Sequence, residues 1–419
     1  MKSMLKTTSL TAVGSLAFLM AGGAHAEQVT LNWALWDFAK APFYQPLIDA
    51  YQAKHPDVKI NYTDLGSTDY MTVLQTQLTG GGGDLDVITV KDVPGYANLV
   101  KSKLLTDVKS AVADPKPYAG LIEALTVDGG LYALPFRTDF WVLYYNKDIF
   151  DKAGVAYPTN DMTLDQWADT ARKLTSGFGA NKVYGSLLHV WRSTVELPAI
   201  LDGKHTLVAD DYSFLKPYYE RALKLQEDGA IPTYASLKTT KTHYSGPFFN
   251  GTVAMLPMGT WFIGTQIAKV KSGESKAAHW GIAKYPHPDG VAAGTTASQV
   301  TSIGVSVNSK HKEAALDFVK FVAGAEGAAI LASTGTIPAM RDDTVLSTIT
   351  ATDGFPADAG SKDAMKTVNT YLEMPVNLKA AQVEVVLNRA HDEIMTNNIK
   401  IEDGLKEMTD GVKPILAAQ

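Results

Sequence analysis

Residues 29–62, VTLNWALWDFAKAPFYQPLIDAYQAKHPDVKINY, contain a strand pattern, a helix pattern and a second strand pattern in succession. Val29 to Leu35 predicts a strand, and Val58 to Tyr62 alternates apolar and polar side chains as a half-buried strand does. Between them, four apolar residues recur at the spacing of one helix face: Phe43, Leu47, Ile48 and Tyr51. This order of elements favours an open α/β lobe.

The alternation of helix and strand patterns continues along the chain. We predict helices over 69–78 and 312–323, strands over 86–90, 142–145, 253–256 and 302–307, and a helix from about Thr260. A further helix begins at the capping box Thr163-Leu164-Asp165-Gln166, and its apolar face carries Leu164, Trp167, Ala168, Ala171 and Leu174. In the helix over 312–323, we expect Ala315, Leu316, Val319 and Val322 to be buried and Gly324 to end the helix.

The first 26 residues have the pattern of a secretory signal peptide. Lys2 and Lys6 precede an apolar stretch, and Ala24-His25-Ala26 is a small-x-small cleavage pattern. A membrane anchor is the alternative, but the apolar stretch is about half of the roughly 20 residues that a span requires. We expect cleavage after Ala26 and a periplasmic protein.

The length and composition of the remaining chain limit its possible fold and partners. Without the leader, 393 residues remain, which favours two lobes over one oversized core. The formal charge of −6 becomes about −8 when the two leader lysines are removed, and acidic and basic residues are mixed, so we expect no nucleic-acid partner. No cysteine is present, so neither a disulfide framework nor a lipid-attachment cysteine is expected.

Motifs for catalysis are scarce. The sequence contains neither Gly-x-Ser-x-Gly nor His-Glu-x-x-His, and its nine histidines are scattered without metal-ligand spacing. We therefore predict no metal, no cofactor and no enzymatic activity. A glycosidase needs only two carboxylates, so Asp37, Asp139 and Glu196 keep a glycoside-active enzyme open as an alternative.

Aromatic and polar side chains stand together at predicted strand ends, where open α/β sheets bind ligands. Trp36-Asp37-Phe38 follows the first strand, and Trp141, Trp191 and Trp261 lie near other strand ends or helix starts. An indole ring suits the apolar face of a pyranose, and a carboxylate accepts hydrogen bonds from its hydroxyls. This combination indicates a sugar site.

Four motifs resemble the family 1 extracellular solute-binding proteins, which include maltose-binding protein and receptors for trehalose, raffinose and glycerol phosphate. The motifs are residues 43–57, Tyr132-Ala133-Leu134-Pro135-Phe136, Leu143-Tyr144-Tyr145-Asn146-Lys147-Asp148, and Phe248-Phe249-Asn250-Gly251-Thr252-Val253-Ala254-Met255. The resemblance implies two α/β lobes, a type II periplasmic-binding-protein fold, that close on a solute by a hinge motion. By similarity, residues 27–135 and about 290–337 form the N-terminal lobe, about 136–289 and 338–419 form the C-terminal lobe, and a hinge passes near residues 135–139.

The resemblance also implies the ligand-binding residues. They are Trp36, Asp37, Phe38, Lys91, Asp92, Thr138, Asp139, Trp191, Arg192, Gly259, Trp261, Ser298, Gln299 and Arg341. Relatives often carry an aromatic residue where this chain has Val90-Lys91, so a mono-, di- or trisaccharide is favoured over a long maltodextrin.

The implied function is a periplasmic receptor of an ABC importer, a monomer that delivers a saccharide to a membrane permease. Non-sugar solutes such as polyols, polyamines or glycerol phosphate remain alternatives within this class, and a sensing role would use the same fold.

Overall fold

The computed structural model describes residues 28–81, 84–118, 120–340, 344–367 and 369–418. The predicted signal peptide and Arg341 therefore lie outside the described residues. Within the described part of the chain, no helix is long and apolar enough to cross a membrane.

The strands form one continuous hydrogen-bonded sheet with the order β2-β1-β3-β8-β4-β6-β5, while β7 pairs with β4 and β9 pairs with β8. Their bounds are β1 Val29–Leu35, β2 Val58–Asp64, β3 Val87–Val90, β4 Leu134–Asn146, β5 Tyr184–Ser186, β6 Val253–Gly259, β7 Trp280–Lys284, β8 Thr296–Val305 and β9 Thr370–Leu372.

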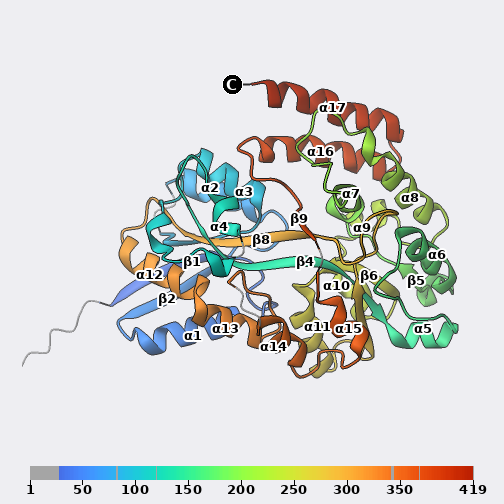
Figure 1. Cartoon of the computed structure of the whole chain (residues 1–419), viewed down its shortest axis with the longest axis horizontal. Helices are drawn as coiled ribbons and strands as arrows, with labels where there is room; N and C mark the ends of the chain where they lie inside the picture. The colour runs from blue at the N-terminus through green and yellow to red at the C-terminus, as the bar shows by residue number, and fades with distance from the viewer. Residues whose placement is uncertain (1–27, 82–83, 119, 341–343, 368, 419) are drawn as a thin grey trace, which may run out of the picture.

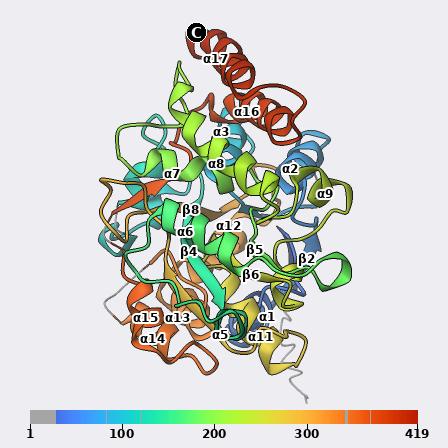
Figure 2. The same ribbon diagram turned by 90° about the vertical axis from the view of Figure 1, so that its right-hand side faces the viewer.

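Helices cover both halves of this sheet (Figures 1 and 2). Those of the first half of the chain are α1 Tyr44–Lys54, α2 Tyr70–Thr79, α3 Val93–Lys101, α4 Leu121–Leu125, α5 Lys147–Ala153, α6 Leu164–Leu174 and α7 Ser193–Ile200. The others are α8 Lys216–Glu227, α9 Tyr234–Thr239, α10 Ser245–Phe249, α11 Phe262–Lys271, α12 Lys312–Ala323, α13 Ala325–Ser333, α14 Val345–Ala351, α15 Ala359–Ala364, α16 Ala380–Met395 and α17 Ile401–Ala417.

The long strand β4 belongs to both halves of the molecule. Residues 134–140 pair with β8 on the N-terminal side, and residues 141–146 pair with β6 and β7 on the C-terminal side. Figure 1 shows β4 and β8 running across the middle, between the blue half and the green half. The two lobes are thus joined through β4, and β8 also contributes to both, with Ala297 in one core and Val300 in the other.

Each half has its own hydrophobic core. One core is built from residues between Leu31 and Phe136 together with residues between Val300 and Ala339. The other is built from residues between Phe140 and Ala297 together with residues between Ala332 and Val412. The two-lobed α/β fold class predicted from the sequence is therefore confirmed.

Several predicted elements are confirmed to the residue, while others differ in extent. The strand over 29–35 and the helix over 312–323 are as predicted. The strand predicted over 142–145 begins at Leu134 instead, because its hinge-side half pairs with β8 although it carries the charged side chains Arg137 and Asp139. Leu316 is only half-buried, since Ala315, Phe318, Val319 and Val322 form the apolar face and Leu316 lies about 100° away from Ala315 around the helix.

The predicted capping box is also confirmed. The Thr163 hydroxyl accepts a hydrogen bond from the Gln166 backbone N–H at 3.2 Å, and the Gln166 side chain accepts one from the Thr163 N–H at 2.9 Å. All five apolar residues expected on the inner face of α6 are buried.

We predict that Thr163→Ala lowers the free energy of unfolding by about 1 kcal/mol, because the Gln166 N–H at the start of α6 loses the hydroxyl oxygen that accepts its hydrogen bond. Denaturant unfolding monitored by circular dichroism measures the change. Thr72→Ala on the exposed face of α2 is the control, and an equal loss in both variants would contradict a capping role for Thr163.

Candidate ligand-binding cleft

A cleft of about 570 Å³ lies between the lobes, which is within the range of small-molecule sites. Residues of both lobes line it. From the N-terminal side come Trp36, Asp37, Lys40, Ala41, Pro42, Phe43, Tyr44, Ser67, Lys91 and Arg137; from the C-terminal side come Trp191, Thr242, His243, Tyr244, Ser245, Gly246, Pro247, Phe249, Asn250, Thr252, Trp261, Thr265 and Lys269; Gln299 of β8 also contributes.

The C-terminal side of the cleft is an aromatic wall formed by Trp191, Tyr244 and Trp261. The ring centroids of Trp191 and Tyr244 are 5.4 Å apart, and those of Trp191 and Trp261 are 6.1 Å apart. Behind them, Trp141 meets Trp261 edge-on at 5.5 Å. Rings that support one another in this way form a preorganised apolar surface, which suits the apolar face of a sugar.

Trp141 does not belong to this surface, which corrects its assignment to a strand end. It lies within β4, is 1% exposed, and its indole N–H donates a hydrogen bond to the Glu373 carboxylate. A ring so enclosed supports Trp261 from below and has no face to offer to a ligand.

Gly259 leaves room for the Trp261 indole. A Cβ atom added at Gly259 would stand 2.1 Å from the six-membered part of that ring, well inside van der Waals contact. The packing of Trp261 therefore explains why position 259 is a glycine, without any direct contact between Gly259 and a ligand.

The N-terminal side of the cleft carries the charges. The Lys91 ammonium and the Arg137 guanidinium lie 5.8 Å and 5.6 Å from the Trp36 ring centroid, and the Tyr70 ring packs 4.9 Å from it. Trp36 is thus surrounded by two cations and an aromatic ring. It lines the cleft mainly as a support for these cations, and less as an open stacking surface.

Arg137 is buried at the point where β4 leaves the N-terminal lobe. Its guanidinium lies 3.4 Å from the Asp139 carboxylate and 5.4 Å from the Phe43 ring centroid. Its Nε–H is buried and has no hydrogen-bond partner within the residues that the structure describes. A buried donor without a partner is costly, so this N–H opposes the burial of Arg137.

Lys91 is held in a similar way. Its ammonium donates to the Ser67 carbonyl at 2.5 Å, and burial lowers the pKa of this ammonium. A desolvated cation beside the cleft gains from any ligand oxygen that restores its lost hydration.

Asp37 is fixed by its backbone. Its φ of 50° places it in the left-handed region, which Asp tolerates better than most residues, and its N–H donates to the Asp64 carboxylate at 3.0 Å. The Asp37 carboxylate in turn pairs with Lys40 at 3.0 Å. The turn after β1 therefore presents a carboxylate and an ammonium together.

Asp139 lies beneath the cleft surface. It is 2% exposed, and its carboxylate accepts a hydrogen bond from the Thr260 hydroxyl at 2.9 Å. The same hydroxyl accepts the Phe140 N–H at 3.3 Å, and the Thr138 N–H donates to the Ile337 carbonyl at 3.1 Å. These bonds fix the strand that joins the lobes, next to Arg137.

The structure thus brings Trp36, Asp37, Lys91, Trp191, Trp261 and Gln299 together at one cleft, among the residues predicted to bind the ligand. Five others are not among the residues that line it. Phe38 stacks on Tyr62 at 3.8 Å, Asp92 caps α3, Arg192 is buried against Glu196, and Ser298 and Thr138 lie on β8 and β4.

Sequence reasoning missed His243, Tyr244, Lys40 and Arg137. Tyr244 is separated from the matched segment Phe248–Met255 by three residues, so the same resemblance could have drawn attention to it and to His243. Arg137 directly precedes Thr138 and Asp139, which were both predicted to bind the ligand.

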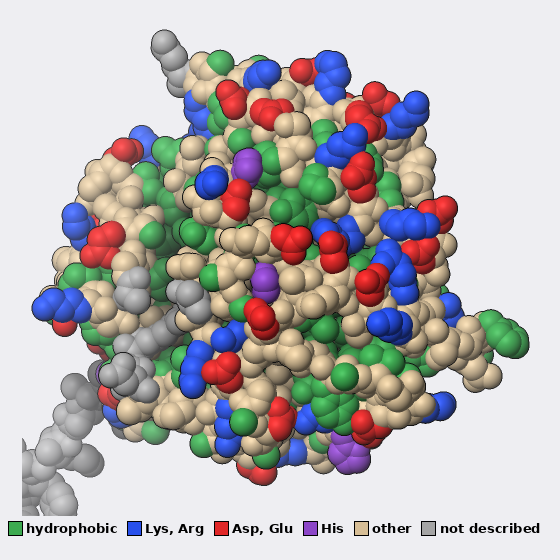
Figure 3. Space-filling model, turned by 45° about the vertical axis from the view of Figure 1, so that its right-hand side comes forward, with side chains coloured by type: hydrophobic (Ala, Val, Ile, Leu, Met, Phe, Trp, Pro, Cys, Tyr) green, Lys and Arg blue, Asp and Glu red, His purple; other side chains and the backbone are tan. Residues whose placement is uncertain are grey.

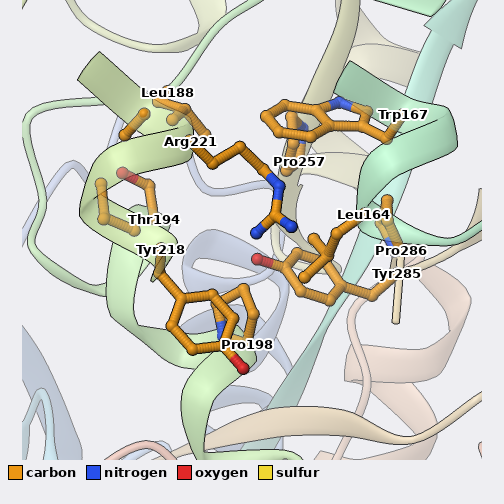
Figure 4. A pocket seen from close by; sticks show the side chains of 12 residues that line it. Leu164, Trp167, Leu188, Thr194, Pro198, Tyr218, Arg221, Pro257, Tyr285 and Pro286 are labelled. Carbon is orange, nitrogen blue, oxygen red and sulfur yellow. The ribbon is translucent and has the colours of Figure 1, made fainter. Parts of the chain in front are cut away.

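A second cavity lies inside the C-terminal lobe (Figure 4). It is lined by Trp167, Arg221, Tyr285 and neighbouring apolar residues, but its volume of about 20 Å³ holds about one water molecule. It is too small for a sugar. Among the described residues, no group of three or more His, Cys, Asp or Glu side chains could hold a metal ion.

Two α/β lobes on a shared strand, with a polar and aromatic cleft between them, define a two-lobed binding protein. The sequence profile of the bacterial extracellular solute-binding proteins matches residues 36–329, and the chain belongs to this family.

Known proteins agree with this assignment. The chain is 26% identical over 335 residues to a lactose-binding protein of Rhizobium radiobacter, covering 75% of each chain. Among solved structures, a sugar transporter of Rhizobium etli in an open conformation is 65% identical, with 92% of this chain and 99% of that chain covered and a TM-score of 0.76. An ABC substrate-binding protein of Listeria monocytogenes in complex with cycloalternan has the same fold, with a TM-score of 0.78 at 22% identity and 94% and 100% coverage.

We predict that Gly259→Ala displaces the Trp261 ring and so changes the near-ultraviolet circular dichroism of the aromatic wall. Gly246→Ala is the matched control, because a Cβ at Gly246 meets no atom within 4 Å and Gly246 also lines the cleft. Identical spectra for Gly259→Ala and the unchanged protein would show that Trp261 does not depend on this glycine.

Proposed function

We propose that this protein is a periplasmic sugar receptor of an ABC importer, which holds a mono-, di- or short oligosaccharide between its lobes and delivers it to a membrane permease. The observation that carries the proposal is the division of the cleft. The aromatic wall suits a sugar ring face, and the opposite side offers charged groups to the ring hydroxyls.

The comparisons support sugar as the solute class. One relative is a lactose-binding protein, another is a mannitol-binding protein of Pseudomonas aeruginosa that is 30% identical over 136 residues, and the relative from Rhizobium etli is a sugar transporter. A glycerol-phosphate-binding protein also matches, at 27% identity over 270 residues, so a polyol phosphate is the main alternative.

A closing motion is part of the proposal. The open relative, at 65% identity, aligns with a TM-score of 0.76, no higher than the 0.78 of the relative at 22% identity. Two lobes that take different relative positions explain why sequence identity does not order these scores. We propose residues 27–135 with 290–337 and residues 136–289 with 338–419 as the moving bodies, and the two separate cores support this division.

A glycoside-active enzyme is less well supported. Of the three acids that kept this reading open, only Asp37 lines the cleft. Glu196 is fully buried, pairs with Arg192, and accepts a hydrogen bond from the Tyr219 hydroxyl at 2.6 Å. Acids placed in this way do not flank a common bond, as glycoside hydrolysis requires.

We predict that one group of sugars raises the unfolding temperature in a panel of mono-, di- and trisaccharides, polyols, glycerol phosphates and polyamines. A ligand at 100 times its Kd adds about 2.7 kcal/mol, which a thermal scan detects easily. The sugar should be recovered intact after incubation. A shift with glycerol phosphate alone would contradict a sugar receptor, and cleavage of the sugar would contradict a receptor that performs no chemistry.

We predict that Trp261→Ala weakens binding of the sugar found in that panel by at least about 0.5 to 1.5 kcal/mol, because a stacking surface is lost. Calorimetric titration measures the affinity. Phe178→Ala is the matched control, since this ring is 88% exposed and does not line the cleft. If Trp261→Ala unfolds without sugar, or binds normally, the aromatic wall is not the sugar surface.

A further inference from the structure

The charges that line the cleft differ from those of the rest of the protein. The whole chain has a formal charge of −6, and Figure 3 shows acidic and basic side chains interspersed on one face of the molecule. His243 adds no charge to the cleft at neutral pH, because burial lowers the pKa of its ring. Among the described residues that line the cleft, the one acid is Asp37, and the basic residues are Lys40, Lys91, Arg137 and Lys269. The lining therefore has an excess of positive charge.

Most of these cations already have a carboxylate partner. The pairs are Lys40 with Asp37 at 3.0 Å, Arg137 with Asp139 at 3.4 Å, and Lys269 with Glu274 at 2.5 Å. In each pair the protein itself supplies the negative charge. None of these three cations therefore requires an anion from a ligand.

Lys91 is the exception. Within the described part of the chain its ammonium forms no ion pair, and the one acceptor bonded to it there is the Ser67 carbonyl, at 2.5 Å. The carboxylate of the adjacent Asp92 is turned to the start of α3, where it accepts the Gly95 N–H at 2.7 Å. An ammonium has three N–H donors. Two donors of Lys91 thus have no acceptor among the described residues.

The position of Lys91 makes this unpaired charge available to a ligand. Lys91 lines the cleft, and its ammonium lies 5.8 Å from the centroid of the Trp36 ring. An unpaired charge in a partly dehydrated site is costly. A sugar hydroxyl would accept a hydrogen bond from the ammonium but would leave its charge unbalanced. A carboxylate would accept the hydrogen bond and balance the charge as well.

We propose that the solute of this cleft is an acidic saccharide, whose carboxylate binds the Lys91 ammonium while its sugar ring packs on Trp191 and Trp261. The inference rests on the sugar-receptor function above and adds the charge of the sugar. One unpaired cation matches the single charge of a carboxylate. A phosphate group, with a charge of about −1.5 to −2 at pH 7, would bring more negative charge than Lys91 balances.

The test compares neutral sugars with their acids. Calorimetric titration of the full chain uses glucose with glucuronate, galactose with galacturonate, and the 1,4-linked disaccharides of galactose and galacturonate. Within each pair, a carboxylate replaces a hydroxymethyl group. In the pair that binds, we expect the acid to bind at least about tenfold more tightly, because a hydrogen bond between charged groups is stronger than one to a hydroxyl. Added salt should reduce this difference by screening.

Three variants locate the charge that recognises the acid. Lys91→Met removes the ammonium and should reduce the preference for the acid to about threefold or less. Lys91→Arg keeps a cation at this position and should retain a preference. Lys173→Met is the matched control, because this lysine is exposed on α6 and does not line the cleft, so the preference should not change. Near-ultraviolet circular dichroism of each variant checks that the cleft is folded.

The outcomes separate this inference from the sugar-receptor function. The inference is wrong if the neutral sugar binds as tightly as its acid, if Lys91→Met retains the full preference, or if glucose 6-phosphate binds more tightly than glucuronate. In each of these cases a saccharide still binds, so the receptor function stands. If no saccharide binds, neutral or acidic, the proposed sugar receptor is itself contradicted.

Discussion

The structure depends on one strand that serves two lobes. All thirteen residues of β4 are buried, and its two halves pair with different neighbours, so neither lobe can be completed without it. Because β4 is continuous, it fixes the distance between the lobes. The angle between the lobes depends on the backbone dihedral angles near residues 140 and 141, where β4 changes its pairing from β8 to β6 and β7. The hydrogen bonds of Asp139 and Thr260 lie there. The geometry of the cleft is set at this place.

The cleft is divided between an apolar side and a charged side, and this division follows from the lobes. Trp191, Tyr244 and Trp261 pack against the C-terminal core, Asp37 and Lys91 follow strands of the N-terminal lobe, and Arg137 lies on β4 between the two cores. Neither side alone encloses a ligand. Under the proposed function, a sugar bound to one side would still lack contacts with the other side. The full set of contacts would form only when the lobes meet, so binding would favour closure.

The sequence predicted the elements better than the interior of the cleft. Helix α6 was predictable from its capping box and apolar spacing, since both are local signals. Local sequence signals could not show that Trp141 is buried while Trp261 lines the cleft. Both residues stand near predicted strand ends or helix starts, and they differ only in the residues that pack over them. Lys91 illustrates the same limit: its position after β3 is local, but its distance from Trp36 depends on the packing of two strands. The roles of the predicted ligand-binding residues remain predictions.

If the lobes close as proposed, the charged side gives a reason why they would stay open without a ligand. The proposed closure would dehydrate Lys91 and Asp37 further, and buried polar groups without full hydrogen bonding are costly. The unpartnered Nε–H of Arg137 is one such cost that the structure shows within its described residues. A polyhydroxylated ligand replaces the lost water with oxygens in fixed positions, and an apolar ligand of equal size could not. Under the proposed function, a hydroxyl-rich solute would be preferred because it would replace the water that these charged groups lose on closure.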